Sequence, residues 1–370
     1  MGASLNQANI GVQAGIRWPA KLAIFLRNEI RAQPIVYALI LLLLSETIVI
    51  SRWLDDPLIP FLLEYALRAA KGALLLASLA FITAAVGVLA QRSETPLRDL
   101  RQIALRLWKG NILRRYAYAC AVVTVFMAAF LYNKTMIPKL NPFGWDATFA
   151  EWDRLLFGGS QPWELLHPVL AIPAITIVLD FTYSLWVPLF MLFWCLAFAS
   201  PRVPAELRNR YWLATVASWI LIGLVLAAVF SSAGPCYFAY LVPGTPSPYA
   251  ELEKYLSSVN DVQLLGSTLV KEYLWFIYSG GYDAPGGISA MPSMHNAQAV
   301  LFAAAAYQID RRLGHLMLAY VVIIFVGSIH LAWHYAIDGI VGAACAAAIW
   351  WLAGELVKHQ AKVVAVPNRI

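Results

Sequence analysis

Long apolar stretches separated by short polar connections follow one another along almost the whole chain. The stretches run roughly from 34 to 51, 69 to 90, 115 to 132, 168 to 199, 211 to 233, 292 to 308, 316 to 333 and 336 to 355. A helix needs about 20 mostly apolar residues to cross a hydrocarbon core about 30 Å thick. We therefore predict an all-α integral membrane protein with about eight transmembrane helices. The sequence does not show the short alternating strands of a membrane β-barrel.

Two segments need a separate interpretation. Between residues 17 and 31, four basic side chains fall within one arc of a helix and apolar side chains fall opposite, which predicts an interfacial helix before the first span. The stretch from 168 to 199 is too long for one simple helix. Because proline favours helix starts and interrupts helix interiors, Pro173 is expected to divide this stretch into a short interfacial piece and a true span.

The composition agrees with residence in a membrane. Of the 370 residues, 61% are hydrophobic and 13% are charged, whereas about a quarter are charged in ordinary soluble domains. The formal charge of +6 would suggest nucleic acid for a soluble chain, but the basic residues here cluster between apolar spans. We expect them to orient the chain in the bilayer, and we expect no nucleic-acid partner. The first apolar run has the character of a retained span and not of a removable signal peptide.

The basic connections predict the topology, because Lys and Arg collect in cytoplasmic loops near the ends of spans. The basic segments are the N-terminal segment, residues 92–115, 202–210 and 311–312, and the tail with Lys358 and Lys362. Their alternation places both termini in the cytoplasm. Residues 133–165 and 234–291 and the link near His334 then face the periplasm, the extracellular space or a lumen. Long loops of this kind commonly carry function.

This topology divides the multi-pass chain into four parts. Residues 1–33 contain the cytoplasmic interfacial helix, and 34–110 contain two N-terminal spans with a basic cytoplasmic loop. Residues 111–358 form a six-span core and 359–370 a cytoplasmic tail. We expect the protein in a cell membrane.

His334 and Asp338 form the strongest candidate for chemistry inside the apolar part of the chain. In the run from Trp333 to Gly339, their spacing of four is expected to put both side chains on one helical face, about 6 Å apart. The carboxylate can accept a proton from one imidazole nitrogen, which leaves the lone pair of the other nitrogen free to attack. Ionisable groups in spans are costly unless they are paired or solvated, so this pair indicates function.

A second candidate lies where a glycine-containing loop enters a span, at Pro292-Ser293-Met294-His295. The free backbone N–H groups of a helix start, together with the Ser293 hydroxyl, are expected to form a phosphate cradle. His295 stands beside that cradle and can act as a general acid. If the intervening span hairpin has the predicted topology, the starts of the sixth and eighth spans lie at the same external face. His295 and His334 should then meet.

These residues resemble the type 2 phosphatidic acid phosphatase superfamily of membrane phosphatases and phosphotransferases. Its members carry Pro-Ser-Gly-His at the start of one span and, two spans later, Ser-Arg, five residues, His, three residues and Asp. Pro292-Ser293-Met294-His295 matches the first motif with Met in place of Gly, and His334 and Asp338 match the end of the second. The chain looks most like the inositol phosphorylceramide synthase branch, because a His-Tyr, two residues, Asp pattern is usual there.

The resemblance covers roughly the six spans from residue 115 onward and implies a mechanism. His334 attacks phosphorus and becomes a phosphohistidine, while His295 protonates the leaving alcohol and then acts as a base. Water or another alcohol takes the phosphoryl group. The resemblance implies membrane lipids and a lipid-linked phosphate as partners, and no metal or other cofactor. The oligomeric state is open.

Two departures from the family pattern concern charge stabilisation. The family's arginine six residues before the nucleophilic histidine is replaced by Ser328, and its upstream lysine with Arg-Pro has no clear counterpart. Stabilisation of negative charge at phosphorus must then come from elsewhere. The candidates on the same face are the helix start at Ser293 and the side chains of His330, Lys271, Lys254 and Arg154.

Several alternatives stay open at this point. A lipid phosphate phosphatase would use the same side chains with water as acceptor. Asp180, deep in the fourth apolar stretch, could belong to a substrate site or a proton path of a transporter, or could bond across helices to a hydroxyl or amide. Two histidines and an aspartate could also bind zinc in a membrane metal enzyme.

Overall fold

A computed structural model describes residues 18–109, 112–199, 203–281 and 285–365, and all regular elements in these ranges are helices. The expected all-α fold is confirmed. Arg17, Arg202 and residues 366–370 of the tail, which entered the topology prediction, lie outside the described residues. The helices before residue 141 are α2 (Trp18–Ala32), α3 (Pro34–Trp53), α4 (Ile59–Ala90), α5 (Pro96–Lys109) and α6 (Ile112–Leu140).

The remaining helices alternate between long spans and short pieces. The middle group is α7 (Asp146–Leu156), α8 (Pro162–Leu170), α9 (Pro173–Ser184), α10 (Trp186–Ala199) and α11 (Ala205–Ile220), which continues through a π-helical turn (Leu221–Leu226) into α12 (Ala227–Val229). The final group is η2 (Pro235–Tyr237), α13 (Phe238–Leu241), α14 (Ala250–Val262), α15 (Gly266–Tyr278), α16 (Met294–Ile309), α17 (Arg311–His330) and α18 (Ala336–Ala365).

Seven described helical segments are long and apolar enough to cross a membrane. They occupy seven of the eight predicted spans, and α16, with 16 residues, occupies the sixth. The predicted break at Pro173 is confirmed, because α8 ends at Leu170 and Pro173 begins α9. The expected helix before the first span is present as α2.

α16 lies at the centre of the bundle and packs against α11, α17 and α18. Small residues allow this close approach. Ala297, Ala299 and Ala306 of α16 are fully buried. Where α18 crosses the start of α16, a side chain at Gly342 would overlap the Ser293 carbonyl. The absence of a side chain at Gly342 therefore allows α18 to pack directly against the start of α16.

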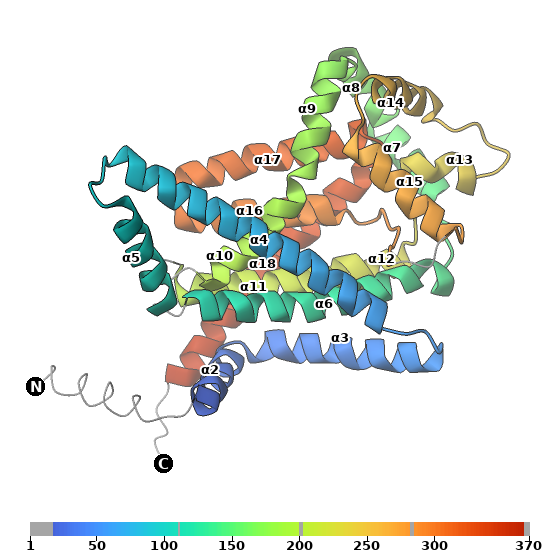
Figure 1. Ribbon diagram of the computed structural model, residues 1–370. Helices are drawn as coiled ribbons and strands as arrows, with labels where there is room; N and C mark the ends of the chain where they lie inside the picture. The colour runs from blue at the N-terminus through green and yellow to red at the C-terminus, as the bar shows by residue number, and fades with distance from the viewer. Residues whose placement is uncertain (1–17, 110–111, 200–202, 282–284, 366–370) are drawn as a thin grey trace, which may run out of the picture.

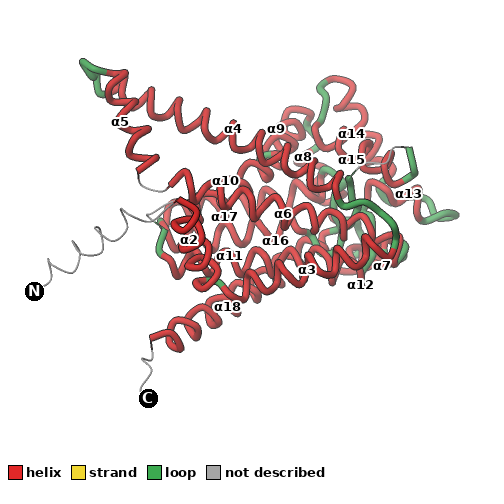
Figure 2. Tube along the Cα trace, turned by 60° about the horizontal axis from the view of Figure 1, so that its bottom comes forward, coloured by secondary structure: helices red, strands yellow, loops and turns green. Residues whose placement is uncertain are grey.

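The short helices gather at one end of the bundle. Figures 1 and 2 both show α7, α13, α14 and α15 together at that end, with α2 and the end of α18 at the other. This arrangement agrees with the predicted topology, in which both termini are on one side and the two long loops on the other. In both views the junction between α4 and α5 projects from the bundle, and α5 returns to contact α6.

Candidate active site

His334 lies in the five-residue link between α17 and α18, not on a helix. The expectation that His334 and Asp338 share a helical face is wrong, because α18 begins only at Ala336. The start of α18 is fixed by Asp153 of α7, whose carboxylate accepts the N–H groups of Ala336 (2.6 Å) and Ile337 (2.9 Å). His334 and Asp338 nevertheless meet, with Nδ1 of the imidazole 3.4 Å from Oδ2 of the carboxylate.

The link that carries His334 is held at several points. The backbone N–H of His334 donates to the carbonyl of Ser328 (3.1 Å), and Oδ2 of Asp338 accepts the N–H of Tyr335 (3.0 Å). Asp338 is fully buried and His334 is nearly so. Nδ1 of His334 faces the carboxylate, so Nε2 is the ring nitrogen on the side away from Asp338. Burial lowers the pKa of His334 to about 3, and the positive charge of Lys134 acts in the same direction.

His295, in the first turn of α16, is clamped between aromatic rings. Its imidazole stacks on Tyr183 at a centroid distance of 4.8 Å and lies 4.6 Å from the Trp186 ring. The indole N–H of Trp186 donates to the His295 carbonyl (3.2 Å). The ring centroids of His295 and His334 are 5.7 Å apart. The structure therefore brings together the two imidazoles that the sequence places 39 residues apart.

Both imidazoles line a cavity of about 610 Å³. This volume is within the usual range for small-molecule sites. Its walls come from α4, α6, α9, α10, α11, η2, α15 and α16, from Ala233 and the loop 285–289, and from Trp333 and His334. None of the described residues that line it is Asp or Glu, whereas Lys134 and Arg68 are both present. A cavity with two cations and two imidazoles is suited to an anionic ligand.

Lys134 of α6 was missed by the sequence analysis. The apolar stretch was taken to end at residue 132, so Lys134 fell in the predicted external loop 133–165 and was not considered. Lys134 lines the cavity, and the loop 285–289 packs against it at Gly287, where an added Cβ would lie 2.8 Å from Cγ of the lysine. The signal that could have found it is a lysine at the end of a span, where buried cations are costly without a function.

Ser293 and Ser328, the two serines of the predicted motifs, form hydrogen bonds within the chain. Ser293 is the N-cap of α16: its hydroxyl accepts the N–H of Asn296 (3.4 Å). The Ser328 hydroxyl donates to the Phe325 carbonyl (2.8 Å). Both side chains are buried and neither is among the residues that line the cavity. Their hydrogen bonds help to fix the start of α16 and the link that carries His334.

The cationic candidates from the sequence lie outside the cavity lining. Arg154 is exposed on α7 and pairs with Glu151 at 2.6 Å, and Lys254 is exposed with Glu251 3.9 Å away. Lys271 is buried behind Trp333, with Nζ 5.9 Å from the indole ring and 3.6 Å from Glu253. Lys271 thus approaches Trp333, which lines the cavity.

The side chains of His330 and Asp180 both form hydrogen bonds between helices. The Nε2 atom of His330 is 2.9 Å from the Thr176 hydroxyl, in a buried cluster at the end of α17. Asp180 accepts the N–H groups of Gly266 (2.8 Å) and Ser267 (2.9 Å). Its carboxylate therefore caps α15, which agrees with the predicted bond across helices to an amide. Gly266 and Ser267 in turn line the cavity.

α7 supplies a second buried carboxylate that sequence analysis did not identify as part of the site. Asp146 accepts the N–H of Gly234 (2.8 Å) and the hydroxyl of Tyr335 (2.9 Å). Gly234 has a φ of 106°, and an added Cβ there would be 2.6 Å from the Trp333 carbonyl oxygen. Asp146 thus joins the chain after α12 to the link that carries His334.

Comparison with known proteins gives one family match. The family model described as PAP2 superfamily matches residues 147–352, which is more than half of the chain and contains both predicted motifs. The match does not distinguish the inositol phosphorylceramide synthase branch from others. Searches of curated proteins and of solved structures found no significant match. With its helical bundle and its match over both motifs, the chain belongs to the PAP2 superfamily, whose membership implies lipid phosphatase or phosphotransferase activity in general.

Proposed function

We propose that the protein is a membrane phosphotransferase that moves a phosphate or phospho-head-group from a lipid-linked donor through a phosphohistidine at His334. The observation that carries this proposal is the approach of the His295 and His334 rings to 5.7 Å within one cavity. Lys134 and Arg68 place positive charge in the cavity wall, and Arg68 also pairs with Glu64 (2.7 Å), which is not among the described lining residues.

In the first half of the reaction, Nε2 of His334 attacks phosphorus and the bond from phosphorus to the alcohol oxygen of the donor breaks. His295 enters the reaction as the protonated imidazolium and gives that proton to the leaving oxygen. A neutral imidazole is required for attack, and the low pKa of His334 supplies it at neutral pH. Once Nε2 carries phosphorus, Nδ1 bears positive charge, which the carboxylate of Asp338 at 3.4 Å stabilises.

In the second half, His295 removes a proton from the acceptor hydroxyl, whose oxygen attacks phosphorus. The bond between phosphorus and Nε2 then breaks, and His334 returns to its neutral form. Negative charge on the equatorial phosphoryl oxygens must be stabilised in both transition states. We assign this role to Lys134, which replaces the cations that the sequence lacks at the family positions.

The acceptor decides between transferase and phosphatase. An alcohol gives a new lipid, and water gives free phosphate by the same steps. We place the site at the non-cytoplasmic face, because the basic connections of the sequence fall at the end of the bundle away from α7, α13, α14 and α15.

The test is a comparison of His334→Ala and His295→Ala with wild type on phosphorus-labelled lipid phosphates, with and without acceptor lipids. We expect His334→Ala to abolish turnover and to remove a base-stable, acid-labile label on the protein. His295→Ala should form the labelled intermediate slowly. His315→Ala is the matched control, because His315 is on the same hairpin and bonds only locally to Tyr307 (2.7 Å).

The same assay separates the alternatives. A new labelled lipid supports transfer, and free phosphate supports the phosphatase. Inhibition by vanadate is expected, whereas loss of activity with a chelator would favour a metal enzyme. Full activity of His334→Ala would contradict the phosphohistidine mechanism, and a transporter would show no labelled protein.

A further inference from the structure

Two residues of α4 line the catalytic cavity although α4 lies wholly outside the family-matched region. Tyr65 and Arg68 contribute to the wall, and the match begins only at residue 147. The superfamily core therefore does not enclose this cavity alone. A wall supplied by an additional helix can adapt a shared catalytic site to one substrate.

The guanidinium of Arg68 is held in a defined position. Its Nε donates to Glu64 one turn earlier (2.7 Å), and its Cζ lies 5.5 Å from the centroid of the Tyr65 ring. An arginine has five N–H donors, so the contact with Glu64 leaves the terminal nitrogens for another acceptor. Glu64 itself is not among the residues that line the cavity.

Arg68 lies at the mouth of the cavity. Its side chain is 46% exposed, and two other residues that line the cavity, Val187 and Val270, are 54% and 48% exposed. Arg68 directly precedes the apolar stretch of α4, which begins at residue 69. An arginine near the end of a span extends toward the level of the lipid head groups. The apolar residues beside it offer a path by which lipid chains can leave the cavity.

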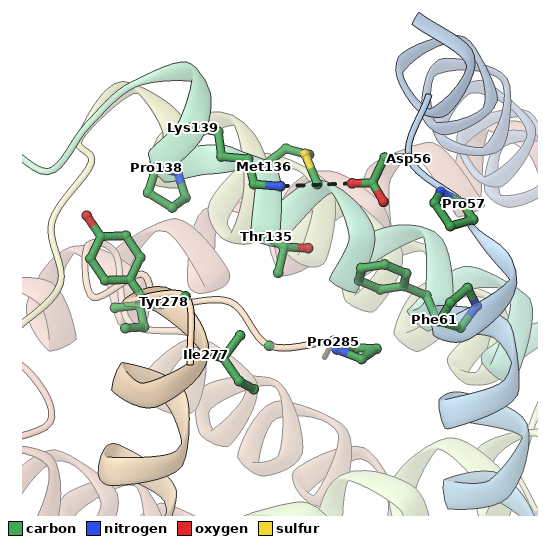
Figure 3. A pocket seen from close by; sticks show the side chains of 14 residues that line it. Asp56, Pro57, Phe61, Thr135, Met136, Pro138, Lys139, Ile277, Tyr278 and Pro285 are labelled. Carbon is green, nitrogen blue, oxygen red and sulfur yellow. Dashed lines mark ion pairs between the residues drawn. The ribbon is translucent and has the colours of Figure 1, made fainter. Parts of the chain in front are cut away.

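A neighbouring hollow shows a different arrangement of charge. It measures about 310 Å³ and shares Pro285, Gly286 and Ile288 with the catalytic cavity. As Figure 3 shows, Lys139 reaches toward Asp56 across this hollow, at 3.9 Å. Lys139 and Asp56 both line this hollow, so the positive charge of Lys139 is offset by a carboxylate of the same hollow. Arg68 and Lys134 have no such counterpart among the lining residues of the catalytic cavity.

We propose that Arg68, supported by Tyr65, forms a second anion subsite that binds a negatively charged group of the lipid substrate other than the phosphoryl group being transferred. This inference rests on the proposed function. The substrate class is a lipid with two anionic groups, of which the outer one is transferred at His334 and the other is held at the cavity mouth. The selectivity for that class then comes from α4 and not from the family core.

Binding measurements test the subsite without requiring turnover. In the His334→Ala protein, the Kd of an alkyl diphosphate is compared with that of the alkyl monophosphate of equal chain length. We expect tighter binding of the diphosphate, and a loss of that preference by about tenfold on adding Arg68→Ala, because a charge-assisted hydrogen bond is removed. Arg68→Lys should restore part of it. Lys71→Ala is the matched control, since it removes one positive charge a turn further along α4 and does not line the cavity.

Each outcome decides the proposal. Equal affinity for the two lipids in His334→Ala, or a preference that survives Arg68→Ala, overturns the subsite. Equal effects of Arg68→Ala and Lys71→Ala would show a general surface charge and would also overturn it. Inorganic pyrophosphate that binds as well as the alkyl diphosphate would refute a lipid ligand. Turnover by wild type is measured in parallel, so failure of the phosphohistidine mechanism is seen separately.

Discussion

The two long helices α4 and α6 both precede the family-matched region, and they differ sharply in how they meet the bundle. α4 is the more hydrophobic, yet 6% of its apolar segment is buried, against 61% for α6. α6 carries Asn133, Lys134 and Thr135 near its outer end, and such groups need protein or cavity partners in a membrane. Hydrophobicity therefore identifies a span, but it does not show how far that span is buried in the bundle.

The same difference appears in what each helix gives to the cavity. α6 contributes Phe130, Leu131 and Lys134 to its inner wall, whereas α4 contributes Tyr65 and Arg68 at its mouth. Most of α4 presents exposed apolar side chains. We infer that α6 belongs to the catalytic machinery and that α4 modifies access to it. Three substitutions sharpen or break this distinction.

The largest effect is expected for Lys134→Met, which keeps the length of the side chain and removes its charge. Loss of one preorganised charge-stabilising group lowers kcat by about 100-fold or more. Steady-state kinetics on a lipid phosphate provide the measurement, and labelling of the protein shows which half-reaction slows. Lys139→Met is the matched control, because Lys139 lies on the same helix, is 65% exposed and lines only the neighbouring hollow. Comparable losses in both variants would refute a special role for Lys134.

An intermediate effect is expected for Asp153→Asn, which acts through the position of His334. Burial raises the pKa of Asp153 to about 7, and the charge of Asp338 contributes. The ionised carboxylate accepts two backbone N–H groups at the start of α18, and protonation replaces one acceptor by a donor. Wild-type kcat should therefore rise as the pH increases through about 7. Other ionising groups add their own contributions to this pH dependence.

Asparagine resembles the protonated acid at every pH. The variant should lose the ionisation near neutrality and be about tenfold slower at about pH 8, with little change in KM, since Asp153 does not line the cavity. The folded protein binds this proton more tightly than the unfolded chain, so the raised pKa makes wild type less stable as the pH rises from about 4 to 7. The variant should lack this dependence as well. An unchanged pH profile would contradict a positioning role.

The sequence predicted the parts of the site that are defined by short spacing. Pro292 to His295 and the His334–Asp338 pair were identified because each lies within a few residues. The common face of the two motifs followed from the topology of one hairpin. The start of α18 was misplaced because the carboxylate that fixes it, Asp153, lies 183 residues before Ala336. Contacts of that range leave no local signal.

The fold shows the same limit. Apolar length predicted the spans and Pro173 predicted a helix start, because both depend on local composition. The burial of α6 and the exposure of α4 depend on partners far along the chain. The sequence therefore gave no reason to single out Lys134 or Arg68, whose side chains line one cavity.

The smallest effect is expected for Asn133→Ala, which tests whether every polar group of α6 serves the site. Asn133 donates to the Thr47 hydroxyl of α3 (2.7 Å), and it is absent from the cavity lining. Such bonds between membrane helices contribute about 0.6 kcal/mol on average. We expect slightly lower thermal stability and kcat within about twofold of wild type. A double-mutant cycle with Thr47→Val measures the coupling, and Ser45→Ala, which alters an exposed hydroxyl on α3, is the control. A fall in kcat comparable with that of Lys134→Met would mean that α3, and not only α6, belongs to the catalytic machinery.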